Sequence, residues 1–145
     1  MLKELIKNKI DIVDSLDSWE DAVKKGAELL LENKCIEPRY VDCIIKNIKE
    51  TGPYIVLGDG MAMSHARPED GVIENGITLL KIKNGVDFFD EKNRVFLLFT
   101  LAAEDNEQHQ DLMGEIADLL NESEKIKRIM YDELTDLEIY NIILQ

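Results

Sequence analysis

The apolar run from Val95 to Ala103, with the sequence VFLLFTLAA, constrains the fold more than any other segment. It is far shorter than the ~20 residues that a membrane-spanning helix requires. Its aromatic and branched residues favour a strand, and its side chains are apolar on both faces. A strand of this kind must be covered on both faces. The run therefore predicts a central strand of a sheet that has helices packed against each side.

The rest of the chain supplies elements for such a fold. We expect strands at Lys9–Val13 (at a sheet edge), Tyr54–Leu57, Met61–Met63 and Ile77–Lys83, turns at Gly58–Gly60 and Asn84–Gly85, and a loop over Ser64–Gly71. We expect three C-terminal helices over Asn106–Asn121, Glu124–Tyr131 and Asp136–Leu144. The fold class is thus α/β, a mixed β-sheet flanked by helices on both faces, in a single domain over residues 1–145.

Two further helices have clear boundary signals. Ser18 is a capping residue with Asp21 three positions later, and apolar residues recur at helical spacing behind it. Pro38 suits the first position of the next helix, and Gly52-Pro53 ends that helix.

Charge and cysteine content narrow the classes of function. The chain has 17 Lys and Arg against 30 Asp and Glu, a formal charge of −13. This surface repels nucleic acid and anionic membranes, and it favours either solubility or a basic protein partner. Cys35 and Cys43 match no zinc or disulfide pattern and indicate free thiols in a reducing compartment. With no secretion signal recognised, we expect a cytoplasmic protein.

The chain has two histidines, in different settings. His65 lies in a loop directly after a short strand, which holds the side chain firmly while leaving it accessible. A neutral imidazole is a nucleophile at cytoplasmic pH. His109 lies near the start of a helix, on the apolar stripe that includes Leu112 and Ile116. It is therefore either a satisfied core histidine or a second imidazole that the helix directs toward His65 to bind a phosphoryl oxygen.

Other chemistries lack their motifs. Gly58-Asp59-Gly60 is followed by neither a third glycine at dinucleotide spacing nor a Lys-Ser pair, so no nucleotide-binding loop is predicted. No Gly-x-Ser-x-Gly elbow occurs. Glu69 and Asp70 match no ligand spacing and are interpreted as solvated. We expect neither a cofactor nor a metal; a metal-dependent hydrolase using the histidines is a minor alternative.

The stretch from Gly58 to Ala66 resembles the active-site signature of the mannitol/fructose-type (type 2) enzyme IIA family of bacterial phosphotransferase systems. Other segments are most similar to the ascorbate-type branch: Trp19–Val23, Glu37–Tyr40, Gly52–Tyr54, His65–Val72 and His109-Gln110. The similarity extends from about Trp19 to Leu120. It implies the enzyme IIA type-2 fold and a phosphocarrier, which is a phosphotransferase component.

The resemblance also implies roles for individual residues and partners. His65 takes a phosphoryl group from HPr on its tele nitrogen and passes it to a cysteine of enzyme IIB, which works with a membrane IIC component. His109 matches the second active-site histidine and would stabilise the phosphoryl group. Ser64 replaces the proline of the signature and would offer a hydroxyl to the phosphoryl group. Arg67 would supply positive charge, whereas Lys49 stands where mannitol-type members have an arginine.

A different function remains open at this point. The same fold serves as a regulatory module whose phosphorylation state controls a transcription regulator or a transporter. The sugar also stays open, because the membrane component recognises it and the ascorbate-like motifs indicate only a branch. The oligomeric state is not indicated.

Overall fold

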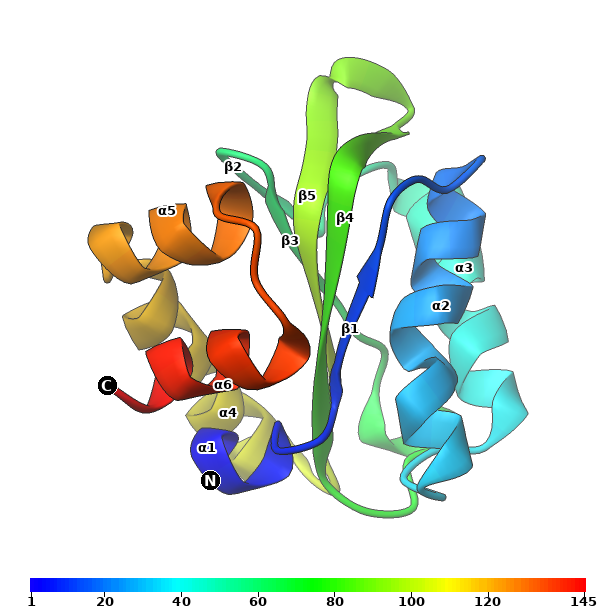
Figure 1. Ribbon diagram of the computed structural model, residues 1–145. Helices are drawn as coiled ribbons and strands as arrows, with labels where there is room; N and C mark the ends of the chain where they lie inside the picture. Colours follow the sequence, from blue (N-terminus) through cyan, green and yellow to red (C-terminus); the bar gives the residue numbers. More distant parts are fainter.

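Five strands form one mixed sheet that separates two layers of helices in the computed structural model, which describes residues 1–145 (Figure 1). The strands are β1 (Ile10–Val13), β2 (Val56–Gly58), β3 (Met61–Ser64), β4 (Gly76–Phe88) and β5 (Asp90–Ala102). The helices are α1 (Leu2–Leu5), α2 (Trp19–Glu32), α3 (Pro38–Thr51), α4 (Asn106–Leu120), α5 (Ser123–Tyr131) and α6 (Asp136–Leu144), with a 3-10 turn η1 (Pro68–Asp70). Helices α2 and α3 cover one face, and the other helices cover the opposite face.

The strand order is β1-β4-β5-β3-β2, so β5 is the central strand and β1 is an edge strand, as predicted. Strand β4 pairs antiparallel with β5, and β2 pairs antiparallel with β3. The other two pairings, β1 with β4 and β3 with β5, are parallel. The predicted mixed sheet with helices on both faces is confirmed.

Alternation along β5 divides the interior into two cores. Leu98 lies in a cluster of 21 buried residues on the α2 and α3 side. Phe99, the next residue, lies in a cluster of 19 on the side of α1, α4, α5 and α6. Both side chains are fully buried, as the run of apolar residues in this strand requires.

The predicted turn at Asn84-Gly85 is wrong. Strand β4 continues to Phe88, and the hairpin turns at Phe89, whose φ is 76°. Gly85, with φ 73°, instead lies where the register against β5 shifts between Lys81 and Val86. A glycine with positive φ suits a bulge as well as a turn, and here it bends a long strand.

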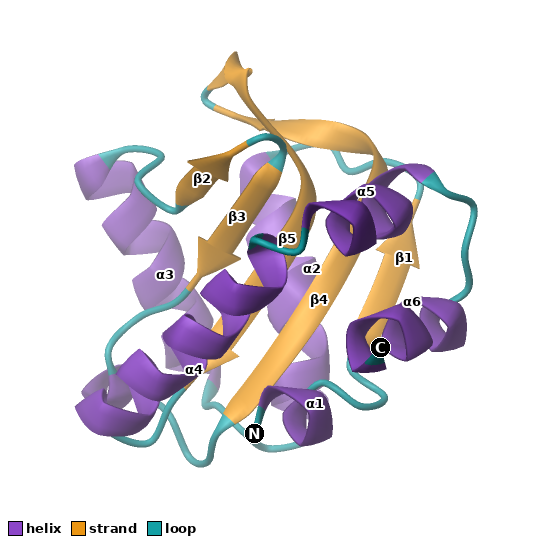
Figure 2. Ribbon diagram, turned by 90° about the vertical axis from the view of Figure 1, so that its left-hand side faces the viewer, coloured by secondary structure: helices purple, strands orange, loops and turns teal.

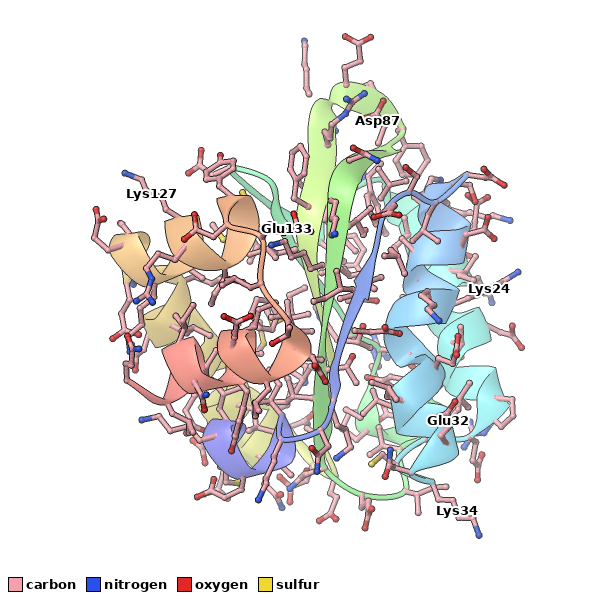
Figure 3. The ribbon with its side chains drawn as sticks, viewed as in Figure 1. Lys24, Glu32, Lys34, Asp87, Lys127 and Glu133 are labelled. Atoms are coloured by element: carbon pink, nitrogen blue, oxygen red, sulfur yellow. The ribbon has the colours of Figure 1, made fainter.

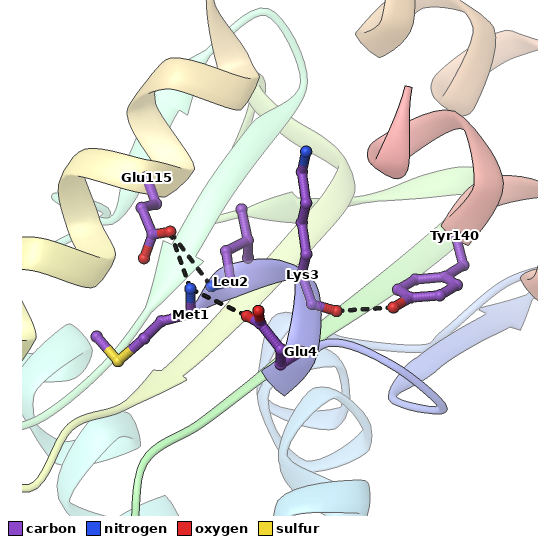
Figure 4. A network of polar contacts seen from close by, with 6 residues as sticks. All are labelled: Met1, Leu2, Lys3, Glu4, Glu115 and Tyr140. Carbon is purple, nitrogen blue, oxygen red and sulfur yellow. Dashed lines mark hydrogen bonds and ion pairs between the residues drawn. The ribbon is translucent and has the colours of Figure 1, made fainter.

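Helix α1 was not predicted, because four residues show no measurable periodicity. Its position is secured by polar contacts (Figure 4). The Met1 amine contacts Glu4 at 3.0 Å and Glu115 of α4 at 3.3 Å, and the Tyr140 hydroxyl of α6 donates to the Lys3 carbonyl at 2.8 Å. These bonds join the first helix to two helices of its layer.

Charged side chains lie on the outside of both layers (Figure 3). Lys24 and Glu32 of α2 and Lys127 of α5 are exposed examples. No helix in the structure has both the length and the apolar content that crossing a membrane would require.

We predict that Leu98→Ala and Phe99→Ala are both strongly destabilising, although they are neighbours on opposite faces. Each leaves a cavity in a different core, which lowers the free energy of unfolding by about 2–5 kcal/mol. Urea denaturation measures this, with the exposed Glu91→Ala as a control expected within about 0.5 kcal/mol of wild type. A small effect for either core variant would contradict burial on both faces.

Candidate active site

The two histidines are brought together by the ends of two parallel strands. His65 directly follows β3, and β5 leads through a short loop into α4, which contains His109. Because β3 and β5 are parallel and Ser64 pairs with Thr100, both strands end at the same edge of the sheet (Figure 2). The start of α4 lies at that edge.

Alternation along β3 decides which way each side chain points. Ala62 belongs to the core under α2 and α3, and Met63 belongs to the core under α4. His65 has the parity of Met63 and faces α4. Its ring lies 5.1 Å from that of His109, centroid to centroid, with the planes tilted by 56°.

A backbone contact fixes the tautomer of His65. Its Nδ1 lies 3.3 Å from the carbonyl oxygen of Met63. A carbonyl only accepts hydrogen bonds, so Nδ1 must hold the proton in the neutral ring and Nε2 keeps its lone pair. Burial lowers the pKa of His65, and the Met63 contact opposes that shift only in part. His65 is therefore a neutral imidazole with an available Nε2 at neutral pH.

His109 is held by a well-capped helix. The Asp105 side chain accepts a hydrogen bond from the Gln108 amide at 2.8 Å, which starts α4 one turn before His109. Burial lowers the pKa of His109, and the proximity of His65 lowers it further. The ring is half-buried and forms part of a cleft, so the interpretation as a core histidine is wrong.

Both imidazoles line one cleft of about 680 Å³. Its walls are the end of α3, the segment after β3 and the start of α4. Arg67 is the one Lys or Arg residue of the lining, which also includes the carboxylates of Glu50 and Asp70. The Arg67 side chain is exposed and forms no ion pair, while its backbone amide donates to Asp70 Oδ2 at 3.0 Å. Its guanidinium is free to bind an anion in the cleft.

The structure does not support the expected role of Ser64. Ser64 is the last residue of β3. Successive side chains of a strand point to opposite faces, and Met63 faces α4, so the Ser64 side chain points toward α2 and α3 and away from the cleft. The hydroxyl is fully buried and has no hydrogen-bond partner. It therefore cannot donate to a phosphoryl group on His65. Lys49 also lies outside the cleft, beside Asp42 and Lys46 on the outer side of α3.

Several residues of the cleft lining, Glu50 and Thr51 among them, were not predicted from the sequence. Tyr54 meets the His65 ring edge-on, with centroids 6.3 Å apart. Asn47 of α3 and Asn106 of α4 add amide groups to the lining. Tyr54 belongs to the Gly52–Tyr54 segment that is similar to the ascorbate-type branch, whereas neither asparagine belongs to a recognisable pattern.

Comparison with known proteins identifies the family. Residues 4–145 match the family described as phosphoenolpyruvate-dependent sugar phosphotransferase system, EIIA 2. The chain belongs to this family. It is an EIIA component of a sugar phosphotransferase system. Such a component is a phosphocarrier and forms part of a phosphotransferase.

Individual relatives agree with this assignment. The ascorbate-specific PTS system EIIA component of Shigella boydii is 37% identical over 142 residues, 96% of this chain and 92% of the relative. The solution structure of the mannitol-specific cryptic enzyme IIA CmtB from Escherichia coli is 28% identical, with a TM-score of 0.90 over 98% of this chain and 97% of the other. The complex of mannitol enzyme IIA with phosphorylated enzyme IIB from E. coli contains a chain of the same fold (TM-score 0.80, 24% identity, 94% of each chain).

We predict that His65→Gln raises the pKa of His109. Burial is the main cause of the lowered His109 pKa, and it remains; the substitution removes only the charge that His65 gains at acidic pH, which also disfavours protonation of His109. The shift is therefore upward but incomplete, and NMR titration of the His109 ring measures it. An unchanged His109 pKa would show that the two imidazoles are not neighbours in solution.

We also predict that burial of His65 makes stability depend on pH. Its pKa is lower in the folded chain than the ordinary value of 6.5, so the unfolded state binds more protons near that pH. The stabilisation is complete above about pH 6.5 and is lost as the pH falls through the folded pKa. Urea denaturation between pH 8 and pH 5 should show a shallower decline for His65→Gln than for wild type. Parallel declines would contradict the lowered pKa.

Proposed function

We propose that His65 is the phosphoryl carrier of this EIIA component, accepting the group from phospho-HPr on Nε2 and passing it to a cysteine of enzyme IIB. The observation that carries the proposal is the contact between His65 Nδ1 and the Met63 carbonyl. It leaves Nε2 as the nucleophilic nitrogen of a neutral ring at the cleft. In transfer, the Nε2 lone pair forms the new N–P bond while the N–P bond of phospho-HPr breaks, and the electron pair returns to the donor imidazole.

Charge in the cleft supports the transfer of a phosphoryl group. Arg67 is positioned to bind its oxygens, and His109, with its ring centroid 5.1 Å from that of His65, is the second donor. Before phosphorylation, burial keeps His109 neutral at neutral pH. A phosphoryl group on His65 places a dianion beside a neutral ring, so it favours protonation of His109. His109 then donates a charge-assisted hydrogen bond to the group it stabilises.

Family membership supports the remaining steps. We assign enzyme IIB as the acceptor and a membrane IIC component as the transporter, with the carrier acting in the cytoplasm. The names of the relatives support an ascorbate-like sugar acid as the transported substrate. The mannitol proteins in complex provide a precedent for an enzyme IIA of this fold acting on enzyme IIB. The donor is already a phosphoramidate, so transfer onto His65 needs no nucleotide.

Labelling from phosphoenolpyruvate, enzyme I and HPr tests the proposal. We expect one acid-labile, base-stable phosphate on His65 and none in His65→Gln. His109→Ala should slow labelling by about 10- to 100-fold, the equivalent of one charge-assisted hydrogen bond. Label that persists in His65→Gln would refute the assignment of the carrier residue. Label on His65 that does not pass to enzyme IIB would favour the regulatory function.

Lys49 of α3 provides a matched control for the contribution of Arg67 to phosphoryl transfer. We expect Arg67→Ala to slow labelling by about 10-fold or more, with partial recovery in Arg67→Lys, which keeps the charge but loses the planar fork. Lys49→Ala removes a cation that lies outside the cleft and should retain the wild-type rate. Equal losses in Arg67→Ala and Lys49→Ala would indicate a general charge effect instead of contact with the phosphoryl group.

A further inference from the structure

We propose that Tyr40 is a positioning residue, whose hydroxyl sets the placement of the two chain segments that hold His65 and His109. The inference rests on the proposed function of His65 for its effect on phosphoryl transfer. The placement itself is a property of the unphosphorylated protein. Tyr40 lies in the first turn of α3, and its side chain is fully buried on the face of the sheet opposite His109.

The Tyr40 hydroxyl joins two backbone segments at once. It accepts a hydrogen bond from the Ala66 amide at 2.9 Å and donates to the Leu101 carbonyl at 2.6 Å. The Ala66 carbonyl lies farther away, at 3.2 Å, and competes for the same proton. A phenolic hydroxyl both donates and accepts, which is what a bridge between an amide and a carbonyl requires.

The bridge lies where β3 separates from β5, while β5 itself stays paired with β4 through Leu101 and Ala102. The parallel ladder between β3 and β5 ends at the pair Ser64 and Thr100. Ala66 and Leu101 lie just beyond that last pair, and the Tyr40 hydroxyl connects them in place of a direct strand-to-strand bond. Ala66 directly follows His65, and the segment after Leu101 leads into α4 and His109.

The first turn of α3 is itself anchored to the segment that follows His65. Arg39 Nη1 donates to the Glu69 carbonyl at 3.1 Å, and Arg39 Nε pairs with Glu37 at 2.6 Å. Burial raises the pKa of Tyr40, so its hydroxyl stays protonated and able to donate throughout the physiological range. Because Tyr40 does not line the cleft, its effect on the chemistry must act through the segments it joins.

Tyr40→Phe tests the inference, with Tyr140→Phe as the control. Both remove one hydroxyl bonded to a backbone carbonyl, but that of Tyr140 holds α1 on the opposite layer (Figure 4). We expect Tyr40→Phe to slow labelling of His65 by phospho-HPr by about 10- to 100-fold, as misplacement by about 1 Å does. Tyr140→Phe should label at the wild-type rate. Equal rates in the two folded variants would overturn the inference.

NMR of the unphosphorylated protein separates this inference from the proposed function. We expect His65→Gln to raise the pKa of His109 in the otherwise wild-type protein. In Tyr40→Phe the same substitution should produce a smaller rise, because the imidazoles are held less closely. An undiminished rise would overturn the inference, whether or not the protein accepts phosphate. If Tyr40→Phe fails to fold, hydrogen exchange in wild type decides: the Ala66 amide should be protected, and rapid exchange would exclude the bridge.

Discussion

The burial of β5 on both faces is the constraint on which the rest of the structure depends. Leu98 and Phe99 point in opposite directions and are both fully buried, so neither helical layer is dispensable. With helices on both faces, the sheet edge where β3 and β5 end becomes the place where the two layers meet. The cleft lies there, with α3 on one side and α4 on the other, and each layer contributes to its lining.

Partial burial of His65 gives it the properties that a phosphoryl carrier needs. Removing the ring from water disfavours the imidazolium and lowers the pKa of His65. The Met63 carbonyl accepts a hydrogen bond from the proton that remains on Nδ1. The same burial opposes folding at acidic pH, where the unfolded chain binds a proton that the folded chain resists. Stability at low pH is therefore reduced at the residue that we propose as the phosphoryl carrier.

The approach of the two histidines was predictable because both segments follow strands, and parallel strands end at one edge. The role predicted for Ser64 is wrong because the expected loop begins at Ser64, whereas β3 includes that residue. Extending the strand by that residue would have placed its side chain opposite to His65 by alternation alone. The turn predicted at Asn84-Gly85 is wrong for a different reason, because a glycine with positive φ suits a bulge and a turn equally well. The bonds of Tyr40 join α3 to segments 26 and 61 residues away, a separation at which no local pattern operates.

A carrier must release the group as readily as it accepts it, and the composition of the cleft fits that demand. A cradle of several fixed cations would stabilise phospho-His65 too strongly and would slow the onward step. Here the fixed positive charge is Arg67 alone, offset by Glu50 and Asp70. In the proposed mechanism the second positive charge is conditional. Burial disfavours protonation of His109 while His65 is free, and a dianion on His65 would favour it. When the phosphoryl group leaves, the dianion that favours the proton on His109 is gone. The stabilisation of phospho-His65 by His109 is therefore present only while the phosphoryl group is attached.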